Sequence, residues 1–169
     1  MAKVISKGAD EITIQVTIKL TGPMLDMENA IQQELNEAGI LATQEALSQF
    51  EATGQNIKMG GTSLYCKGKV KKEYQTPYGK VALDRYVYQG SRGGSTFSPL
   101  DHRARIIEHS TPKFAKMITH KYACMSAIDT VEDLQENHGR PTSTKYIQAL
   151  SDYAGRSNEN QLDMRTRIK

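Results

Sequence analysis

The stretch EITIQVTIKL at residues 11–20 alternates apolar and polar side chains. Its apolar positions are Ile12, Ile14, Val16 and Ile18. Successive side chains of an extended chain point to opposite faces, so this alternation is typical of a strand buried on one face. The sequence Thr21-Gly22-Pro23 follows, and we expect the strand to end there.

Residues 24–51 repeat apolar side chains at steps of three and four, which predicts one long helix or two helices in line. We expect a kink at Gly39 and an end at Gly54. The apolar stripe either packs in the core or forms a dimer interface, and the pattern leaves both open. It contains Ile31, Leu35, Ala38, Ala42, Ala46 and Phe50.

Two β-rich runs, residues 64–75 and 80–89, flank the sequence TPYG at residues 76–79. Proline presets the backbone of a turn, and glycine readily adopts a positive φ, which we expect at Gly79. The pattern predicts a β-hairpin over residues 67–88. In its second arm one face carries Val81, Leu83 and Val87, and the other carries Tyr86 and Tyr88.

Three helical patterns follow, over residues 111–126, 128–139 and 143–155. A proline after Thr111 is typical of a helix start, and Gly155 predicts the end of the third helix. The expected core positions are Phe114, Met117, Ile118, Tyr122, Met125, Val131, Leu134, Ile147, Leu150 and Ala154.

Two stretches have no clear period. Residues 90–95 predict a flexible loop, and residues 97–107 predict a short strand or an extended linker. Together the elements predict an α+β chain. Residues 1–100 would hold the strand, the long helix and the hairpin, residues 101–155 a helical unit, and residues 156–169 a polar tail with a basic end.

The composition is that of an ordinary globular chain, with 169 residues, 38% hydrophobic and 24% charged. No stretch approaches the roughly 20 apolar residues that a membrane-spanning helix needs. The N-terminus lacks the apolar region of a signal peptide. We therefore expect a cytoplasmic protein without a membrane span.

The net charge of +3 is unevenly distributed. Residues 1–56 contain three lysines and eight acidic residues, whereas residues 57–92 contain eight basic and two acidic residues. A concentrated basic segment favours a polyanionic partner.

The connection between the last two helices has features of a helix-turn-helix motif, in which a short turn precedes a recognition helix. Gly139 would form the turn, and Arg140 would hold a DNA phosphate. Ser143 is the predicted N-cap, because its hydroxyl can accept a hydrogen bond from a free amide of the first turn.

The predicted recognition helix presents polar side chains away from Ile147 and Leu150. Glutamine can read adenine, and lysine can reach guanine or phosphate. The exposed residues are Thr144, Lys145, Gln148 and Ala149. A plain helical hairpin explains the same pattern, because Asp152 and the acidic helix at residues 129–136 would repel phosphate.

The hairpin and the loop after it supply the second candidate DNA-binding surface. Lysines interleaved with tyrosines suit phosphate contact or base stacking. The basic residues are Lys67, Lys69, Lys71, Lys72, Arg85 and Arg92. The alternative is an edge strand that lysines protect from aggregation.

No catalytic residue, metal ligand set or cofactor is predicted. Cys66 and Cys124 stand far apart, and His120 with Cys124 makes only a pair on one helix face. A two-metal nuclease needs carboxylates from different elements, whereas the clustered ones here share one helix. They are Asp129, Glu132, Asp133 and Glu136.

Five segments, in this order, resemble the N-terminal region of bacterial insertion-sequence transposases of the ISKra family: NEAGILATQEAL, KGKVKKEYQTPYGKVALDRYVYQ, GGSTFSPLDHRARII, STPKFAKMITHKYA and VEDLQENHGRPTSTKYIQ. The similarity covers about residues 24–155. Members of this family often have cysteine where Ser98 stands, which further lowers the expectation of a metal site.

Such transposases carry a DNA-binding region before a DDE catalytic domain. The resemblance implies that this chain binds the double-stranded terminal repeats of an insertion sequence, without catalysis of its own, in the bacterial cytoplasm at the nucleoid. The resemblance implies a downstream DDE chain as a protein partner, and the apolar stripe of residues 24–51 leaves a homodimer open. A free-standing repressor of the element and an adaptor that recruits a catalytic subunit are the alternatives.

Overall fold

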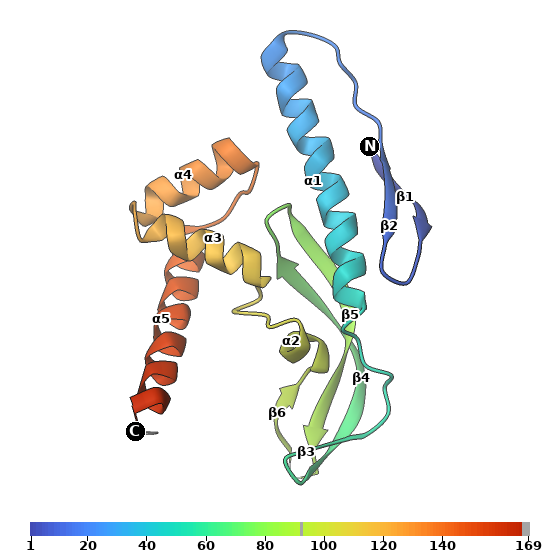
Figure 1. Ribbon diagram of the computed structural model, residues 1–169, viewed down its shortest axis with the longest axis vertical. Coiled ribbons are helices and arrows are strands. Elements are labelled where there is room, and N and C mark those ends of the chain that lie inside the picture. Colours follow the sequence, from blue (N-terminus) through green and yellow to red (C-terminus); the bar gives the residue numbers. More distant parts are fainter. Residues whose placement is uncertain (92, 167–169) are drawn as a thin grey trace.

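The computed structural model describes the backbone of residues 1–91 and 93–166, and the side chains of residues 1–91 and 93–155. The chain is α+β, as the sequence predicted (Figure 1). Its elements are β1 (Ala2–Lys7), β2 (Ile12–Val16), α1 (Met24–Ser48), β3 (Ile57–Met59), β4 (Thr62–Gln75), β5 (Lys80–Gly90), β6 (Gly93–Phe97), α2 (Pro99–Arg103), α3 (Pro112–Tyr122), α4 (Ala127–His138) and α5 (Thr144–Thr166).

In the described part of the chain the strands form two separate antiparallel sheets. The predicted strand is confirmed as β2, and it pairs with β1, which the sequence analysis missed. Two apolar residues stand side by side in β1, Val4 and Ile5, and the register shifts between Val4 and Ser6. This irregularity removes the alternation that identifies a strand. The second sheet has the order β3-β4-β5-β6.

The predicted hairpin is confirmed as β4 and β5, joined by the turn at residues 76–79. Its glycine has a different role from the one predicted, because Gly79 is not among the residues with positive φ. A Cβ at this position would lie 2.3 Å from Cδ1 of Ile40. Glycine is therefore needed here so that α1 can approach the turn.

The long helix α1 continues through Gly39, and this glycine also serves a close contact. A Cβ on Gly39 would lie 2.2 Å from Cγ of Tyr78, in the same turn. Two glycines thus bring the helix and the hairpin turn together, one from each side.

Replacing Gly39 with alanine is expected to lower the free energy of unfolding by about 1–2 kcal/mol, because the Tyr78 ring must move away. In a Tyr78→Ala background the same change should instead raise it by about 1 kcal/mol, through better helix propensity. Urea denaturation of the four proteins in this cycle measures both effects. A stabilising Gly39→Ala change in the wild-type background would contradict the packing role.

The apolar stripe of α1 is mostly not in the core. Leu47 is the buried side chain of this helix, and Ile40 packs beside it. In contrast, Leu35 is 54% exposed and Phe50 is 39% exposed. Helix α1 contacts β1, β2 and β5. Of the predicted stripe, Leu35, Ala46 and Phe50 are exposed and the other three residues are half-buried.

Three stretches differ from the predictions. The predicted loop at residues 90–95 contains the start of β6, and residues 97–107 contain α2, whose first residue is Pro99. The third helix does not end at Gly155, because α5 runs to Thr166 and so includes most of the predicted tail. One glycine costs a helix only about 1 kcal/mol, which polar helix formers after it can offset.

The described residues form two hydrophobic clusters, and the boundary between the two clusters falls between two neighbouring residues of the chain. Ile106 packs with the sheet cluster, whereas Ile107 packs with the three-helix cluster. The sheet unit thus extends past residue 100, where the sequence analysis divided the chain. The sheet cluster is built on Leu47, Tyr74, Val81 and Leu100. The helical cluster is built on Phe114, Ala115, Ile118, Leu134, Ile147 and Leu150.

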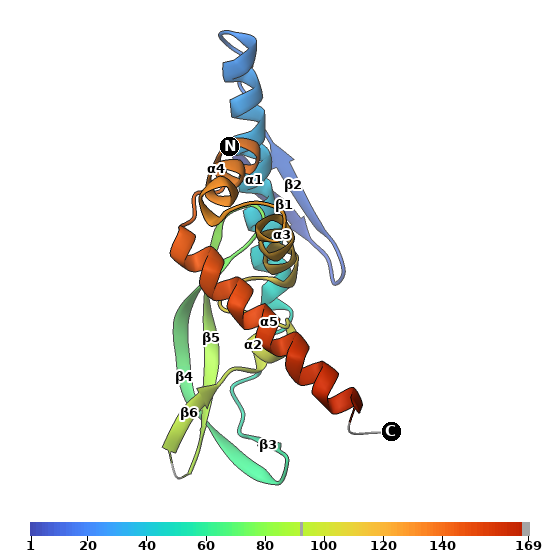
Figure 2. The ribbon, with the colours of Figure 1, turned by 90° about the vertical axis from the view of Figure 1, so that its left-hand side faces the viewer.

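The two units join at the hairpin turn. Gln75 forms a parallel bridge with Ser110, its amide donates to the carbonyl of His109 at 2.7 Å, and its carbonyl accepts from the Thr111 amide at 2.9 Å. The Asn36 side chain of α1 also donates to the carbonyl of His138 at 3.0 Å. The helical unit is therefore seated on the end of the hairpin, and α5 runs obliquely across this side of the molecule (Figure 2).

Candidate nucleic-acid interface

The α4–α5 connection has well-formed caps on both sides. Gly139 ends α4 in the left-handed conformation, with φ of 59°. The Ser143 hydroxyl accepts a hydrogen bond from the Tyr146 amide at 3.2 Å, so the predicted N-cap of α5 is confirmed. Helix α4 therefore ends at Gly139, and α5 begins directly after Ser143.

The first two turns of α5 divide into a core face and a solvent face. Ile147 and Leu150 have no exposed surface and pack in the helical cluster. The predicted base-reading residues are exposed: Thr144, Lys145, Gln148 and Ala149. These side chains lie together at the start of a capped helix, where a recognition helix presents its reading residues.

Arg140 lies inside the protein, not on the DNA-facing surface where the sequence analysis placed it. Its side chain is 3% exposed. Nε donates to the carbonyl of Thr76 at 2.9 Å, and Nη2 donates to Oε1 of Gln75 at 2.8 Å. The guanidinium also stands 5.1 Å from the ring centre of Phe114, and burial lowers the pKa of Arg140. Through these two hydrogen bonds Arg140 holds the α4–α5 connection against the hairpin turn.

The lysines of β4 do not form one surface. Adjacent strand residues point to opposite faces, so Lys71 and Lys72 are separated. Nζ of Lys72 lies 3.4 Å from Nε2 of His109, beside the helical unit. Lys67, Lys69 and Lys71 are exposed, and Nζ of Lys69 lies 4.9 Å from the ring centre of Tyr86. The exposed three remain available for phosphate contact.

Arg85 also differs from its predicted place. Its side chain is 13% exposed, and Nη1 lies 3.4 Å from Oδ2 of Asp101 in α2. The same carboxylate accepts a hydrogen bond from the Tyr74 hydroxyl at 2.6 Å, and burial with this bond raises the pKa of Tyr74. Arg85 therefore holds α2 against the sheet. Arg92 lies outside the described residues.

Only some of the hairpin tyrosines can meet a base. Tyr74 and Tyr88 have no exposed surface, so neither can stack on a nucleotide. Tyr65 is 43% exposed, and Tyr86 is half-buried beneath Lys69. The hairpin surface is thus mainly a set of lysines.

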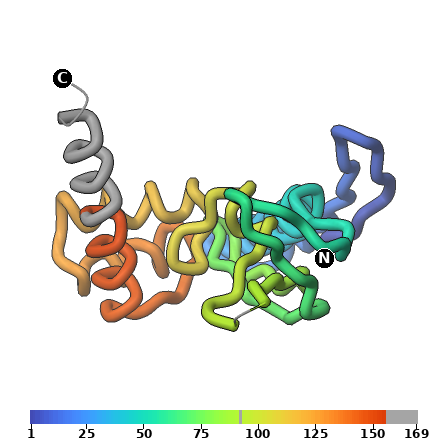
Figure 3. The backbone as a smooth tube through the Cα atoms, turned by 90° about the horizontal axis from the view of Figure 1, so that it is seen from below, coloured from blue at the N-terminus to red at the C-terminus, as the bar shows by residue number. Residues whose placement is uncertain are grey.

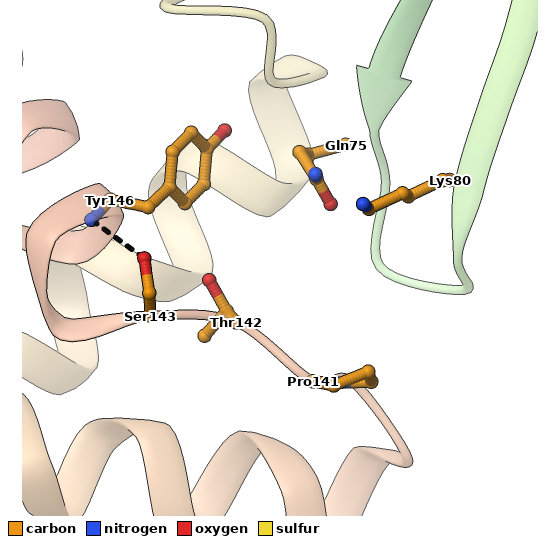
Figure 4. Close-up of a pocket in the computed structure, with 6 residues that line it drawn as sticks. All are labelled: Gln75, Lys80, Pro141, Thr142, Ser143 and Tyr146. Carbon is orange, nitrogen blue, oxygen red and sulfur yellow. Dashed lines mark hydrogen bonds between the residues drawn. The ribbon is translucent and has the colours of Figure 1, made fainter.

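A pocket of about 420 Å³ lies between the hairpin turn and the start of α5 (Figure 4). It is lined by Gln75, Lys80, Pro141, Thr142, Ser143 and Tyr146. The sequence analysis missed Lys80, because no local signal shows that residues 75–80 and 141–146 meet. Only the packing of the two units brings them together.

A second basic surface lies on α3. A pocket of about 260 Å³ on this helix is lined by Lys113, Lys116, Met117, His120 and Lys121. Lys121 pairs with Asp133 of α4, and this pairing lowers the pKa of Asp133. The helical spacing of residues 113, 116 and 120 is visible in the sequence and could have identified this face.

The described residues contain no group of three or more His, Cys, Asp and Glu side chains placed to hold a metal ion. Asp129 belongs to the capping box of α4, where it bonds with Ser126. Cys66 and Cys124 are free thiols. None of the helices in the described part of the chain combines the length and apolar character that crossing a bilayer requires.

Comparisons with protein-family models, curated proteins and solved structures find no match to this chain. The fold defines an α+β protein in which a capped three-helix unit is seated on a basic hairpin. The resemblance to insertion-sequence transposases stays a prediction.

Proposed function

We propose that this protein binds double-stranded DNA through the start of α5. The observation that carries the proposal is the exposed set Thr144, Lys145 and Gln148 at the capped end of a helix whose other face is buried. Such a helix can place lysine and glutamine at base edges in the major groove. Lys67, Lys69 and Lys71 of the hairpin would neutralise backbone phosphates.

The charge distribution favours one side of the protein for the approach of the duplex. The N-terminal hairpin and α5 lie at opposite ends of the molecule (Figure 3). Helix α1 contains Asp26, Glu28, Glu34, Glu37 and Glu45 and no basic residue. These carboxylates would repel DNA, as would the exposed Glu132 and Glu136 of α4. The duplex would thus approach the side of the molecule between the β4–β5 hairpin and the start of α5.

The resemblance to ISKra-family transposases suggests the target, the terminal repeats of an insertion sequence. In this role the protein would act at the bacterial nucleoid, with a DDE chain supplying catalysis. A repressor that binds the element's promoter would use the same surface. The two roles differ in the DNA sites occupied in cells, which chromatin immunoprecipitation would distinguish.

Replacing Lys145 or Gln148 with alanine is expected to cost about 1–3 kcal/mol of binding on the specific site and to relax base preference. Competition binding with terminal-repeat and scrambled duplexes measures both effects. Gln32→Ala is the control, because this exposed glutamine lies on α1. If both substitutions leave affinity and preference unchanged, α5 is not a recognition helix, and the plain helical hairpin is the correct reading.

Protein contact through α1 is a second candidate function. Three apolar side chains near its start and middle are largely exposed: Met24 at 60%, Leu25 at 67% and Leu35 at 54%. This surface would suit a second copy or a catalytic chain. Sedimentation equilibrium of the protein and of Leu35→Lys tests self-association. A monomer at all concentrations would reject the homodimer.

A further inference from the structure

The pocket between the hairpin turn and the start of α5 is assembled from two distant parts of the chain. Gln75 and Lys80 form the last pair of the β4–β5 ladder, and Thr142 and Ser143 belong to the α4–α5 connection (Figure 4). Among the described residues that line the pocket there is no carboxylate, and Lys80 supplies their one charged side chain.

A second positive charge lies behind this wall. The buried Arg140 donates to two carbonyl oxygens, those of Thr76 and the Gln75 side chain, and has no carboxylate partner among the described residues. A buried cation that only dipoles compensate leaves positive potential around it, which favours an anion nearby.

The hydrogen-bonding groups on the wall are suited to an anion as well. Oε1 of Gln75 already accepts from Arg140, so its amide nitrogen is left to donate. The Thr142 hydroxyl and the Lys80 ammonium add further donors. The Tyr146 hydroxyl is already held by Ser110 and by the carbonyl of Glu108, so its ring forms a rigid side of the pocket. Donors from two units converge on one space.

We propose that this pocket binds one backbone phosphate of the duplex, with Lys80 as its principal contact. The proposal rests on the function proposed above, and it gives to Lys80 the phosphate contact that the sequence analysis assigned to Arg140. A phosphate held between the hairpin turn and the first turn of α5 would hold the start of α5 at the duplex, since backbone contacts position a protein and base contacts specify its site.

The test compares Lys80→Gln with Lys3→Gln, a matched change of an exposed lysine on β1 that does not line the pocket. Lys80→Gln should weaken binding about 3–10-fold on specific and scrambled duplexes alike, and reduce the salt slope of log Kd by about 0.9. Base preference and thermal stability should stay unchanged. Lys3→Gln should behave as the wild-type protein.

Duplexes that carry one neutral methylphosphonate at a time locate the contact. The wild-type protein should lose affinity at each phosphate that it contacts, and at one of these positions Lys80→Gln should lose nothing further. Additive losses at every position would overturn the proposal.

Failure of this inference is distinguishable from failure of the proposed function. Wild-type protein that binds no duplex would reject the DNA-binding function and this phosphate contact with it. Wild-type protein that binds DNA, with Lys80→Gln unchanged in affinity and salt slope, would reject the pocket alone. Inorganic phosphate that shifts the Lys80 and Thr142 NMR signals, while Lys80→Gln binds DNA normally, would assign the pocket to a free phosphate instead.

Discussion

Replacing Arg140 with alanine is expected to lower the free energy of unfolding by about 2–4 kcal/mol. The change removes the hydrogen bonds to Thr76 and Gln75 and leaves their oxygen atoms without these donors in a buried place. It also removes the guanidinium that stacks near Phe114. Urea denaturation followed by circular dichroism measures the loss.

Two further variants decide what the loss means. Arg140→Lys keeps the charge but cannot reproduce the fork of donors, so it should also be destabilised. Lys145→Ala, on the exposed face of α5, should unfold as the wild-type protein does. If Arg140→Ala unfolds normally and yet loses DNA affinity, Arg140 is a phosphate contact after all, as the sequence of the turn indicated.

Replacing Thr76 with valine is expected to lower the free energy of unfolding by about 2–4 kcal/mol. Thr76 has no exposed surface. Its hydroxyl accepts from the amides of Tyr78 and Gly79, each at 3.1 Å, and donates to the carbonyl of Gly79 at 2.8 Å. Valine fills the same volume but leaves the amides of Tyr78 and Gly79 without this acceptor, whereas the carbonyl of Gly79 keeps the hydrogen bond from the Thr76 amide.

Thr76→Ser is the matched control, because serine keeps the hydroxyl and loses only a methyl group. It should retain most of the stability that Thr76→Val loses, as thermal and urea denaturation would show. Because this turn also seats the helical unit, Thr76→Val should weaken DNA binding together with stability. Equal stability of the valine and serine variants would show that the hydroxyl contributes little and that the turn is held by packing.

The sequence predicted the elements whose apolar residues repeat regularly. The period of β2 and the stripes of α3, α4 and α5 are local properties, since each reflects which side of one element is buried. The cap at Ser143 was predictable for the same reason, because it depends on neighbouring residues. In contrast, β1, β6 and α2 are short or irregular, and pairing and packing with distant residues define them.

The candidate site likewise combines residues that a local pattern predicts with residues that only tertiary packing brings there. The exposed positions of α5 follow from helical period alone, so Thr144, Lys145 and Gln148 were identified correctly as a solvent face. A basic residue in a turn or strand carries no such signal. Whether Arg140 is buried and Lys80 lines a pocket depends on the docking of the helical unit onto the hairpin turn.

By itself, the sequence determined the α+β class, the hairpin, the three C-terminal helices and the uneven charge. Those features arise within short segments. Only the tertiary structure decided where α1 meets the turn, through Gly39 and Gly79, and which cations remain at the surface. The reason is physical. Burial, close approach and the convergence of hydrogen-bond donors depend on contacts between residues far apart in sequence, and a local pattern does not predict which distant residues come into contact.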